Sequence, residues 1–449
     1  MTRSTFGSFL FALGLIAVGA AYAPRVEAGG GLFQQRSVGG VAINAEGVLE
    51  APTVQDEREL AQLREQTPLK VPAALDEFTE LRAVSLKQLE ATLQQCVKDG
   101  QPIPEEVKYL AGLQRVRYVF IYPEKNDIVI AGPAEGWKMD GLGNVVGATT
   151  NYPVLMLDDL MTALRSGTSS RTEPITCSID PTKEGLQRLN QAMRGRATIG
   201  NPEQTFAEIE EAVGLQDVSV TGVPDTSHFA RTMVAADFRM KRLAMDFEPA
   251  PVKGMPSFLR MTRTTGHGVS NMMQRWWLAP NYEPLAKTAD GLAWELRGPG
   301  VKCLTQESYV DETGAKADSG KKHTTAEKWA ATMTDKFSEL AKVDSSFGQL
   351  RNIMDLAVVG ALIEKDRLLD IAGLQLPRLM AEEQLDRYPA PKHTPTKVSS
   401  VKKGRQWVMT ASGGVEMLPW HIASEVETVE AVGDVRNEMT ADVKEFWWE

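Results

Sequence analysis

Residues 117–130 read RYVFIYPEKNDIVI: two runs of aromatic and β-branched residues on either side of a short polar link. Runs of this composition are typical of strands, and a four-residue link containing proline and asparagine is typical of a hairpin turn. Two strands joined by so short a link pair antiparallel. Elsewhere, strands and helices lack the regular alternation of a parallel sheet. The predicted fold class is therefore α+β, with antiparallel hairpins and meander sheets packed with helices in two closely packed parts.

Cap residues predict where helices begin and end. Ser85 followed by Gln88 forms a capping box, which predicts a helix to about residue 98, closed by Gly100. A second capping box at 324–327 predicts a helix to about residue 342. Its apolar residues recur at helical spacing: Trp329, Met333, Phe337 and Leu340. A further helix is predicted over 347–366.

The second half of the chain is rich in tryptophan, because eight of the nine tryptophans follow residue 270. Four strands, 274–279, 284–288, 292–297 and 301–310, predict an antiparallel meander with turns at 290–291 and 298–300. Prolines 249, 251 and 256 precede them, so we place a boundary at 248–270. This divides the mature chain into an N-terminal α+β part, 29–250, and a Trp-rich α+β part, 270–449. The second part ends in a hairpin, 397–411, and the tail KEFWWE, which either docks on its own chain or inserts into a partner.

The N-terminus predicts secretion. A positive start at Arg3 is followed by the apolar run 9–18 and then by small residues, as in a signal peptide of residues 1–28. Cleavage after Ala28 avoids placing Pro24 directly after the cut. The longest later apolar run, 356–363, is far below the roughly 20 residues that span a bilayer. We expect a secreted or periplasmic protein with no transmembrane span after cleavage.

Composition excludes some classes of protein. The 449 residues carry a net charge of −10, the opposite of a general nucleic-acid binder, so no nucleic-acid partner is expected. Hydrophobic residues make up 43% and charged residues 24%, as in ordinary globular domains. Three cysteines, Cys96, Cys177 and Cys303, are too few for a disulfide scaffold. Buried thiols and one disulfide between two of them both remain open.

Several longer motifs resemble a known family. They are RWWLAPNYEP at 275–284, DGLAWEL at 290–296, GPGVK at 298–302 and QLRNIMDLA at 349–357. Together they resemble an uncharacterised family of secreted proteins from planctomycete bacteria, a domain of unknown function. The resemblance implies a secreted location and one unit over most of the mature chain. It implies no activity, cofactor or catalytic residue.

Motifs for known chemistry are missing from the sequence. The glycine-rich run 140–147 misses the dinucleotide fingerprint by one residue and predicts a turn. The sequence has no phosphate-binding loop, no nucleophile elbow and no strong zinc signature. His323 and Glu327 have metal-ligand spacing, but Glu327 is already used in the capping box. We therefore predict no catalytic residue, no metal site and no cofactor.

Three weaker candidates remain. Asp225, Ser227 and His228 together suggest a hydrolase triad, although neighbours this close in sequence usually cap a helix. His267 lies between two glycines on a loop. The third is a pair of strand carboxylates, Glu295 and Glu307, the residue type that glycoside hydrolases use.

Trp276 and Trp277 are the candidate binding residues. Adjacent side chains on a strand point to opposite faces, so both tryptophans are buried only if both faces are covered. If one face is open, a tryptophan there is available to stack on a sugar ring or to anchor a partner.

The sequence favours a non-enzymatic binding or structural component of the cell envelope, whose partner is an envelope protein or a polysaccharide. The alternative is a secreted hydrolase with a site assembled from distant residues. Oligomeric state is not predicted.

Overall fold

The computed structural model describes residues 41–44, 46–52, 62, 69–193, 201–264, 273–310, 316–318, 324–382, 385–399, 411–439 and 447–448. The predicted signal peptide, His267, His323 and most of the predicted 397–411 hairpin lie outside these ranges. Helices and mostly antiparallel sheets confirm the α+β prediction. The two parallel strand pairs within the described ranges are β10 with β16 and β11 with β17.

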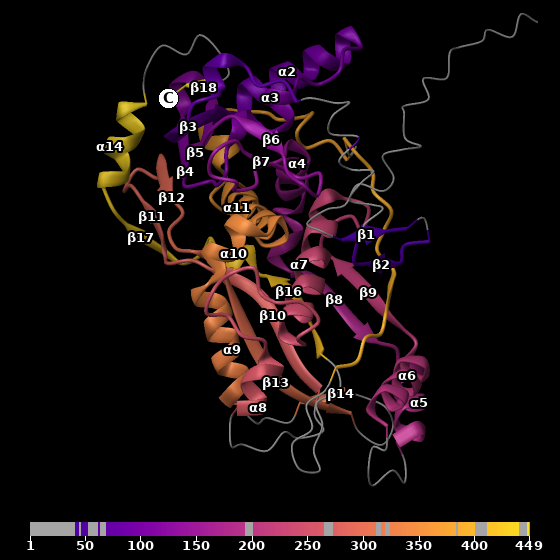
Figure 1. The fold of residues 1–449 in the computed structure, drawn as a ribbon. Coiled ribbons are helices and arrows are strands. Elements are labelled where there is room, and N and C mark those ends of the chain that lie inside the picture. The colour runs from indigo at the N-terminus through magenta and orange to yellow at the C-terminus, as the bar shows by residue number, and fades with distance from the viewer. Residues whose placement is uncertain are drawn as a thin grey trace, which may run out of the picture.

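The first large sheet occupies the lower half of the molecule in Figure 1. Its strands, in spatial order, are β14 (Lys316–Asp318), β13 (Gly300–Val310), β10 (Met273–Asn281), β16 (Ala411–Met417), β8 (Ile175–Pro181), β9 (Leu215–Thr221) and β15 (His393–Pro395). Every second residue of β8, from Ile175 to Pro181, is buried, and those between are partly exposed. One face of this sheet therefore packs on the core and the other faces solvent.

The second large sheet lies at the upper left in Figure 1. Its strands, in spatial order, are β17 (Val426–Thr428), β11 (Leu285–Lys287), β12 (Ala293–Glu295), β4 (Tyr118–Tyr122), β5 (Asp127–Ala134), β3 (Thr79–Ser85) and β18 (Trp447–Trp448). The predicted hairpin is confirmed, because β4 and β5 pair antiparallel across a single 3₁₀ turn, Pro123–Lys125. Asn126 closes that turn in the left-handed conformation, which asparagine tolerates better than most residues.

Two short hairpins complete the strands: β1 (Ala42–Ile43) with β2 (Leu49–Glu50), and β6 (Trp137–Met139) with β7 (Val145–Gly147). Of the C-terminal tail, the structure describes Trp447 and Trp448, which dock on their own chain by pairing with Val84 and Ala83 of β3. Of the two outcomes considered for the tail, these two residues show docking.

Of the predicted four-strand meander, the pairing of the two middle strands is confirmed and the pairing of the outer strands with them is wrong. β10 pairs with β13 in the first sheet, whereas β11 pairs with β12 in the second. The backbone amide of Glu283 donates to the carbonyl of Arg297 between the two pairs, so the segment is one long hairpin that passes from sheet to sheet. Its turn is at Gly291; Gly298 and Gly300 form a corner, at φ of 107° and 91°, where the sequence predicted a turn.

The helices surround and separate the sheets. They are α2 (Leu86–Asp99), α3 (Glu105–Lys108), α4 (Leu157–Ser166), α5 (Lys183–Met193), α6 (Pro202–Val213), α7 (His228–Ala244), α8 (Phe258–Thr264), α9 (Thr324–Asp335), α10 (Phe337–Val343), α11 (Ser345–Lys365), α12 (Leu368–Ala372), α13 (Pro419–Ile422) and α14 (Ala431–Glu438). The predicted helix 324–342 is present but divided at Lys336, and its stripe of four apolar residues is buried.

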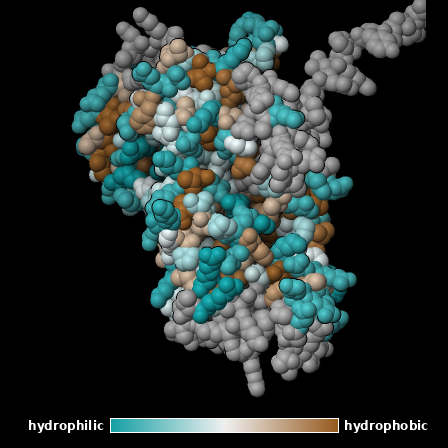
Figure 2. All heavy atoms as spheres, viewed as in Figure 1, coloured by the Kyte–Doolittle hydropathy of each residue, from teal (hydrophilic) through white to brown (hydrophobic). Residues whose placement is uncertain are grey.

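Helix α11 is central. Every residue from Ser345 to Ile363 is buried, and Figure 1 shows the helix in the middle of the molecule, between the two large sheets. Among the helices of the described ranges, none has both the length and the apolar character needed to cross a membrane. Figure 2 shows hydrophilic and hydrophobic residues mixed over most of the described surface on the face in view.

Each large sheet takes strands from both sides of the predicted boundary at 248–270. β8 and β9 precede it and pair in one sheet with β10, β13 and β16, which follow it. The division into parts 29–250 and 270–449 stays a prediction. The thiols of Cys96, Cys177 and Cys303 are all free, so no pair of them forms a disulfide.

Candidate functional site

The two adjacent tryptophans of β10 have different surroundings. Trp276 is fully buried on the core face, where its ring packs edge-on against Phe258 and Trp329 at centroid distances of 5.0 and 5.1 Å. Trp277 lies on the opposite face and is half-buried. The open-face alternative of the sequence analysis therefore applies to Trp277, and Trp276 belongs to the core.

Strand register places a row of side chains across this outer face. Trp277 lies between Leu304 of β13 on one side and Gly414 of β16 on the other. Beyond Gly414, the row continues with Ser178 of β8 and then Ser219 of β9. Leu304 is 36% exposed and Ser219 is exposed. We call the solvent-facing side of these strands the open face. Its row runs from an apolar end at β13 to a hydroxyl end at β9.

Hydroxyl groups cover the β8–β9 end of the open face. The hydroxyls of Ser178 and Ser219 hydrogen-bond to each other at 2.9 Å, and those of Thr176 and Thr221 do so at 2.8 Å. Cross-strand hydroxyl pairs of this kind also stabilise a sheet. Each hydroxyl has more hydrogen-bonding capacity than one such contact uses, so the pairs can still bond to a ligand.

Gly414 leaves a trough between the indole and the hydroxyls. A Cβ atom at this position would lie 1.9 Å from the carbonyl oxygen of Cys177, so no side chain fits there without moving β8. The neighbouring strands approach closely at this point, and Gly414 places no side chain between Trp277 and Ser178. Glycine at 414 therefore shapes the open face.

A groove of about 290 Å³ follows this trough. The side chains that line it with hydrogen-bonding or aromatic groups are Thr176, Ser178, Arg275, Trp277, Gln306 and Glu416. The guanidinium of Arg275 lies 5.8 Å from the centroid of the Trp277 ring, within the range of a cation–π contact. One cationic and one anionic side chain line the groove, so its formal charge is balanced.

Helix α7 supports the groove from the core side. Lys241 donates hydrogen bonds to the carbonyls of Ile179 and Gly413, at 3.0 and 3.3 Å, and so ties β8 to β16. Its ammonium also pairs with Asp237 at 2.8 Å. Burial raises the pKa of Asp237 to about 6, even though the charge of Lys241 acts to lower it.

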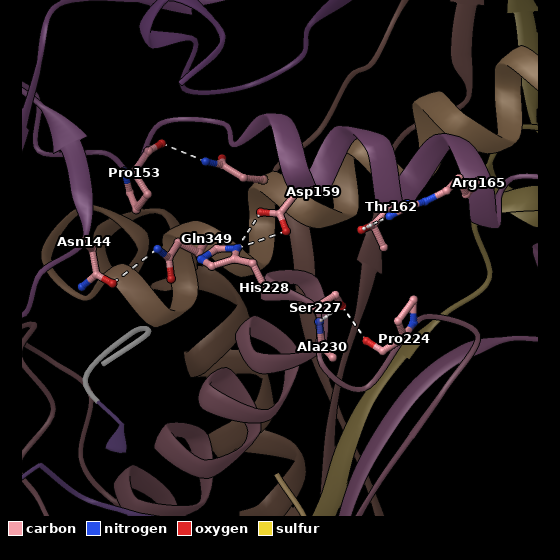
Figure 3. A network of polar contacts seen from close by, with 11 residues as sticks. Asn144, Pro153, Asp159, Thr162, Arg165, Pro224, Ser227, His228, Ala230 and Gln349 are labelled. Atoms are coloured by element: carbon pink, nitrogen blue, oxygen red, sulfur yellow. Dashed lines mark hydrogen bonds and ion pairs between the residues drawn. The ribbon is translucent and has the colours of Figure 1, made fainter. Parts of the chain in front are cut away.

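A second polar cluster lies in the core between α4 and α7. The Nδ1 atom of His228 is 2.8 Å from a carboxylate oxygen of Asp159, and Figure 3 shows the pair between the two helices. Burial acts to lower the pKa of His228, but the charge and hydrogen bond of Asp159 together with the charge of Asp158 act to raise it, and the net shift is upward. Burial and the charge of Asp159 raise the pKa of the neighbouring Asp158 to about 6.

This cluster gives the suggested triad residues structural roles. The Ser227 hydroxyl caps α7 by accepting from the amide of Ala230, and it donates to the carbonyl of Pro224 (Figure 3). His228 is 4% exposed, and within the described ranges no hydroxyl or thiol forms a hydrogen bond with its Nε2 atom. A histidine–aspartate pair without a nucleophile beside it serves here to join α7 to α4.

The remaining candidates are not brought together. Glu295 lies on β12 of the second large sheet, and Glu307 lies on β13 of the first. In the described part of the chain, no group of three or more His, Cys, Asp or Glu side chains is placed to hold a metal ion. Among the groove residues, the sequence analysis identified only Trp277. Of the others, only Gly413 and Gly414 stand out in the sequence, as a pair of adjacent glycines.

Comparison with known proteins identifies one segment. Residues 177–258 match a family described as "Protein of unknown function (DUF1598)". The chain therefore contains a domain of unknown function at these residues, and the motifs at 275–302 and 349–357 lie outside it. No curated protein and no solved structure matches the chain. The matched segment supplies Cys177 and Ser178 to the groove and includes His228 and Lys241, whereas Arg275, Trp277 and Gln306 lie outside it.

Proposed function

We propose that this protein is secreted and acts as a non-enzymatic binding component of the cell envelope, with the open face as its binding surface. One observation carries the proposal: Trp277 is half-buried beside a groove on a solvent-facing sheet, while its neighbour Trp276 is fully buried. A large aromatic side chain left partly in water provides contact area that a partner can cover. The apolar N-terminal run supports the secreted location.

The location is tested by the mass of the mature protein. We expect the chain purified from the periplasm or medium of its source organism to begin at Gly29, after cleavage behind Ala28. Recovery of the full chain from the cytoplasm would contradict this part of the proposal.

The binding surface is tested by co-sedimentation of the mature chain with the envelope fraction of the same organism. Trp277→Ala removes the aromatic surface and should weaken binding at least tenfold. Trp420→Ala is the matched control, because Trp420 is also half-buried and also lies 5.8 Å from an arginine, Arg171. Equal binding by the wild type and both variants would overturn the proposal, provided that all three unfold at similar temperatures.

A further inference from the structure

We infer that the groove on the open face binds a neutral polysaccharide chain of pyranose rings with equatorial hydroxyls. This inference rests on the proposed function and names the chemical class of its partner. It follows from the order of groups across the groove, from their charge and from the size of the groove.

The apolar side of the groove fits the face of a sugar ring. A pyranose with equatorial hydroxyls presents its C–H groups on its two faces, and such a face packs on an aromatic ring. Trp277 provides the ring, and Leu304 lies next to it in the same row and is 36% exposed. Trp277 lines the groove, and Leu304 extends its apolar surface beyond the groove lining.

The polar side fits the rim of the same ring. Sugar hydroxyls both donate and accept, so their recognition needs both kinds of group. The Ser178 and Thr176 hydroxyls do both, the Gln306 amide has one end of each kind, Arg275 donates and Glu416 accepts. Gly414 leaves the space in which a ring contacts the indole and the hydroxyls at once.

Charge favours a neutral chain over an acidic one. Arg275 and Glu416 line the same groove and balance each other. An acidic ligand such as a uronic acid polymer would gain from Arg275 but would meet the carboxylate of Glu416. A neutral chain uses both side chains as hydrogen-bonding groups, and such bonds to charged groups are the stronger kind.

Size argues against a protein as the occupant. A stable protein interface takes roughly 800 Å² from each partner and has an apolar centre. The groove of about 290 Å³ is at the lower end of small-ligand sites, which span roughly 300–1,000 Å³, and more of its exposed lining is polar than apolar. One or two sugar rings of a longer chain match these dimensions.

The test is isothermal titration calorimetry of the mature chain with cellohexaose and with chitohexaose, two neutral chains with equatorial substituents. We expect at least one of them to bind, with a dissociation constant at least tenfold weaker for Trp277→Ala. Trp277→Phe keeps an aromatic face and should stay within about threefold of the wild type. Trp420→Ala should leave the dissociation constant unchanged. A polygalacturonate oligomer of similar length should bind more weakly than the neutral chain.

Envelope fractions distinguish the two proposals. After protease digestion of the fraction, we expect Trp277-dependent binding to persist. If digestion abolishes it and neither hexasaccharide binds, the polysaccharide inference is overturned while the proposed binding function stands. If Trp277→Ala changes neither measurement, both proposals fall. Tighter binding of polygalacturonate than of either neutral chain would also overturn the inference.

Discussion

Asp158 is an ionisable group in a position that disfavours its charge. It is 6% exposed and neighbours Asp159, and its Oδ2 atom has no hydrogen-bond partner in the described part of the chain. Its Oδ1 atom accepts from the backbone amide of Leu385 at 3.2 Å. Burial and the charge of Asp159 raise its pKa from 3.8 to about 6. Because the folded protein holds this proton more tightly than the unfolded chain, Asp158 contributes most stability at low pH, and its contribution falls as pH rises from about 4 to 6.

Asp158→Asn should therefore stabilise the protein at neutral pH. The variant carries no charge at this position, so the free energy of unfolding at pH 7.5 should rise by about 1–2 kcal/mol. At pH 4 the two proteins should differ little. Urea denaturation of both proteins at pH 4, 5, 6 and 7.5 measures this difference. Asp159→Asn is the opposite control: it breaks the ion pair with His228 and should destabilise. If the free energies of unfolding of Asp158→Asn and the wild type differ by the same amount at every pH, the raised pKa of Asp158 is not the cause of the difference.

At the scale of elements, two helices cross with almost no side chain between them. A Cβ atom at Gly360 of α11 would lie 2.3 Å from the carbonyl oxygen of Ala163 in α4. Gly167, directly after α4, would place a Cβ atom 2.6 Å from the carbonyl oxygen of Gly360. Helix α4 therefore covers one side of the buried helix α11 at backbone distance.

Gly360→Ala should destabilise the protein by about 1–3 kcal/mol, since the new methyl group forces the two helix backbones apart. Alanine is the better helix former, so a helix-propensity effect alone would change stability in the opposite direction. Urea denaturation at pH 7.5 provides the measurement. Gly141→Ala is the control, because a Cβ atom at Gly141 would have no other heavy atom within 4 Å, and it should stay within about 0.5 kcal/mol of the wild type. A neutral or stabilising effect of Gly360→Ala would show that the crossing can relax.

At the scale of the whole molecule, the two large sheets are built from interleaved parts of the chain. In the first sheet, β16 lies between β10 and β8, which are about a hundred residues apart in sequence. In the second, the predicted 117–130 hairpin joins β12 on one side and β3 on the other, and β3 also pairs with the C-terminal β18. Both sheets also share the long hairpin from β10 to β13.

We expect neither half to fold alone. Cutting at residue 250 leaves β8 without β16, β9 without β15 and β4 without β12, and each of these strands then exposes an edge and part of its buried face. Fragments 29–250 and 251–449, expressed separately, should show no cooperative thermal transition by circular dichroism, whereas 29–449 should show one. A cooperative transition in either fragment would establish an independent domain and confirm the boundary at 248–270.

Local features were predictable from sequence because neighbouring residues determine them. The 117–130 hairpin, the Ser85 cap of α2 with Gly100 at its end, and the apolar stripe on α9 and α10 are all confirmed. Turn chemistry, capping hydrogen bonds and hydrophobic period act over a few residues. The placement of Trp276 and Trp277 on opposite faces also follows from the strand pleat alone.

Which faces are covered and which strands meet depends on contacts between distant segments. Nothing local to β10 indicates that α8 and α9 cover Trp276, or that Gly414, 137 residues further along the chain, lies beside Trp277. The prediction of a meander failed for the same reason, because each strand was assigned to its nearest neighbour in sequence. Strand partners are selected by how much apolar surface the whole chain buries. The total buried apolar area depends on segments that are far apart in sequence. Local sequence was therefore enough to define the elements and the alternation of their faces, whereas long-range burial selected the sheets, the open face and the groove.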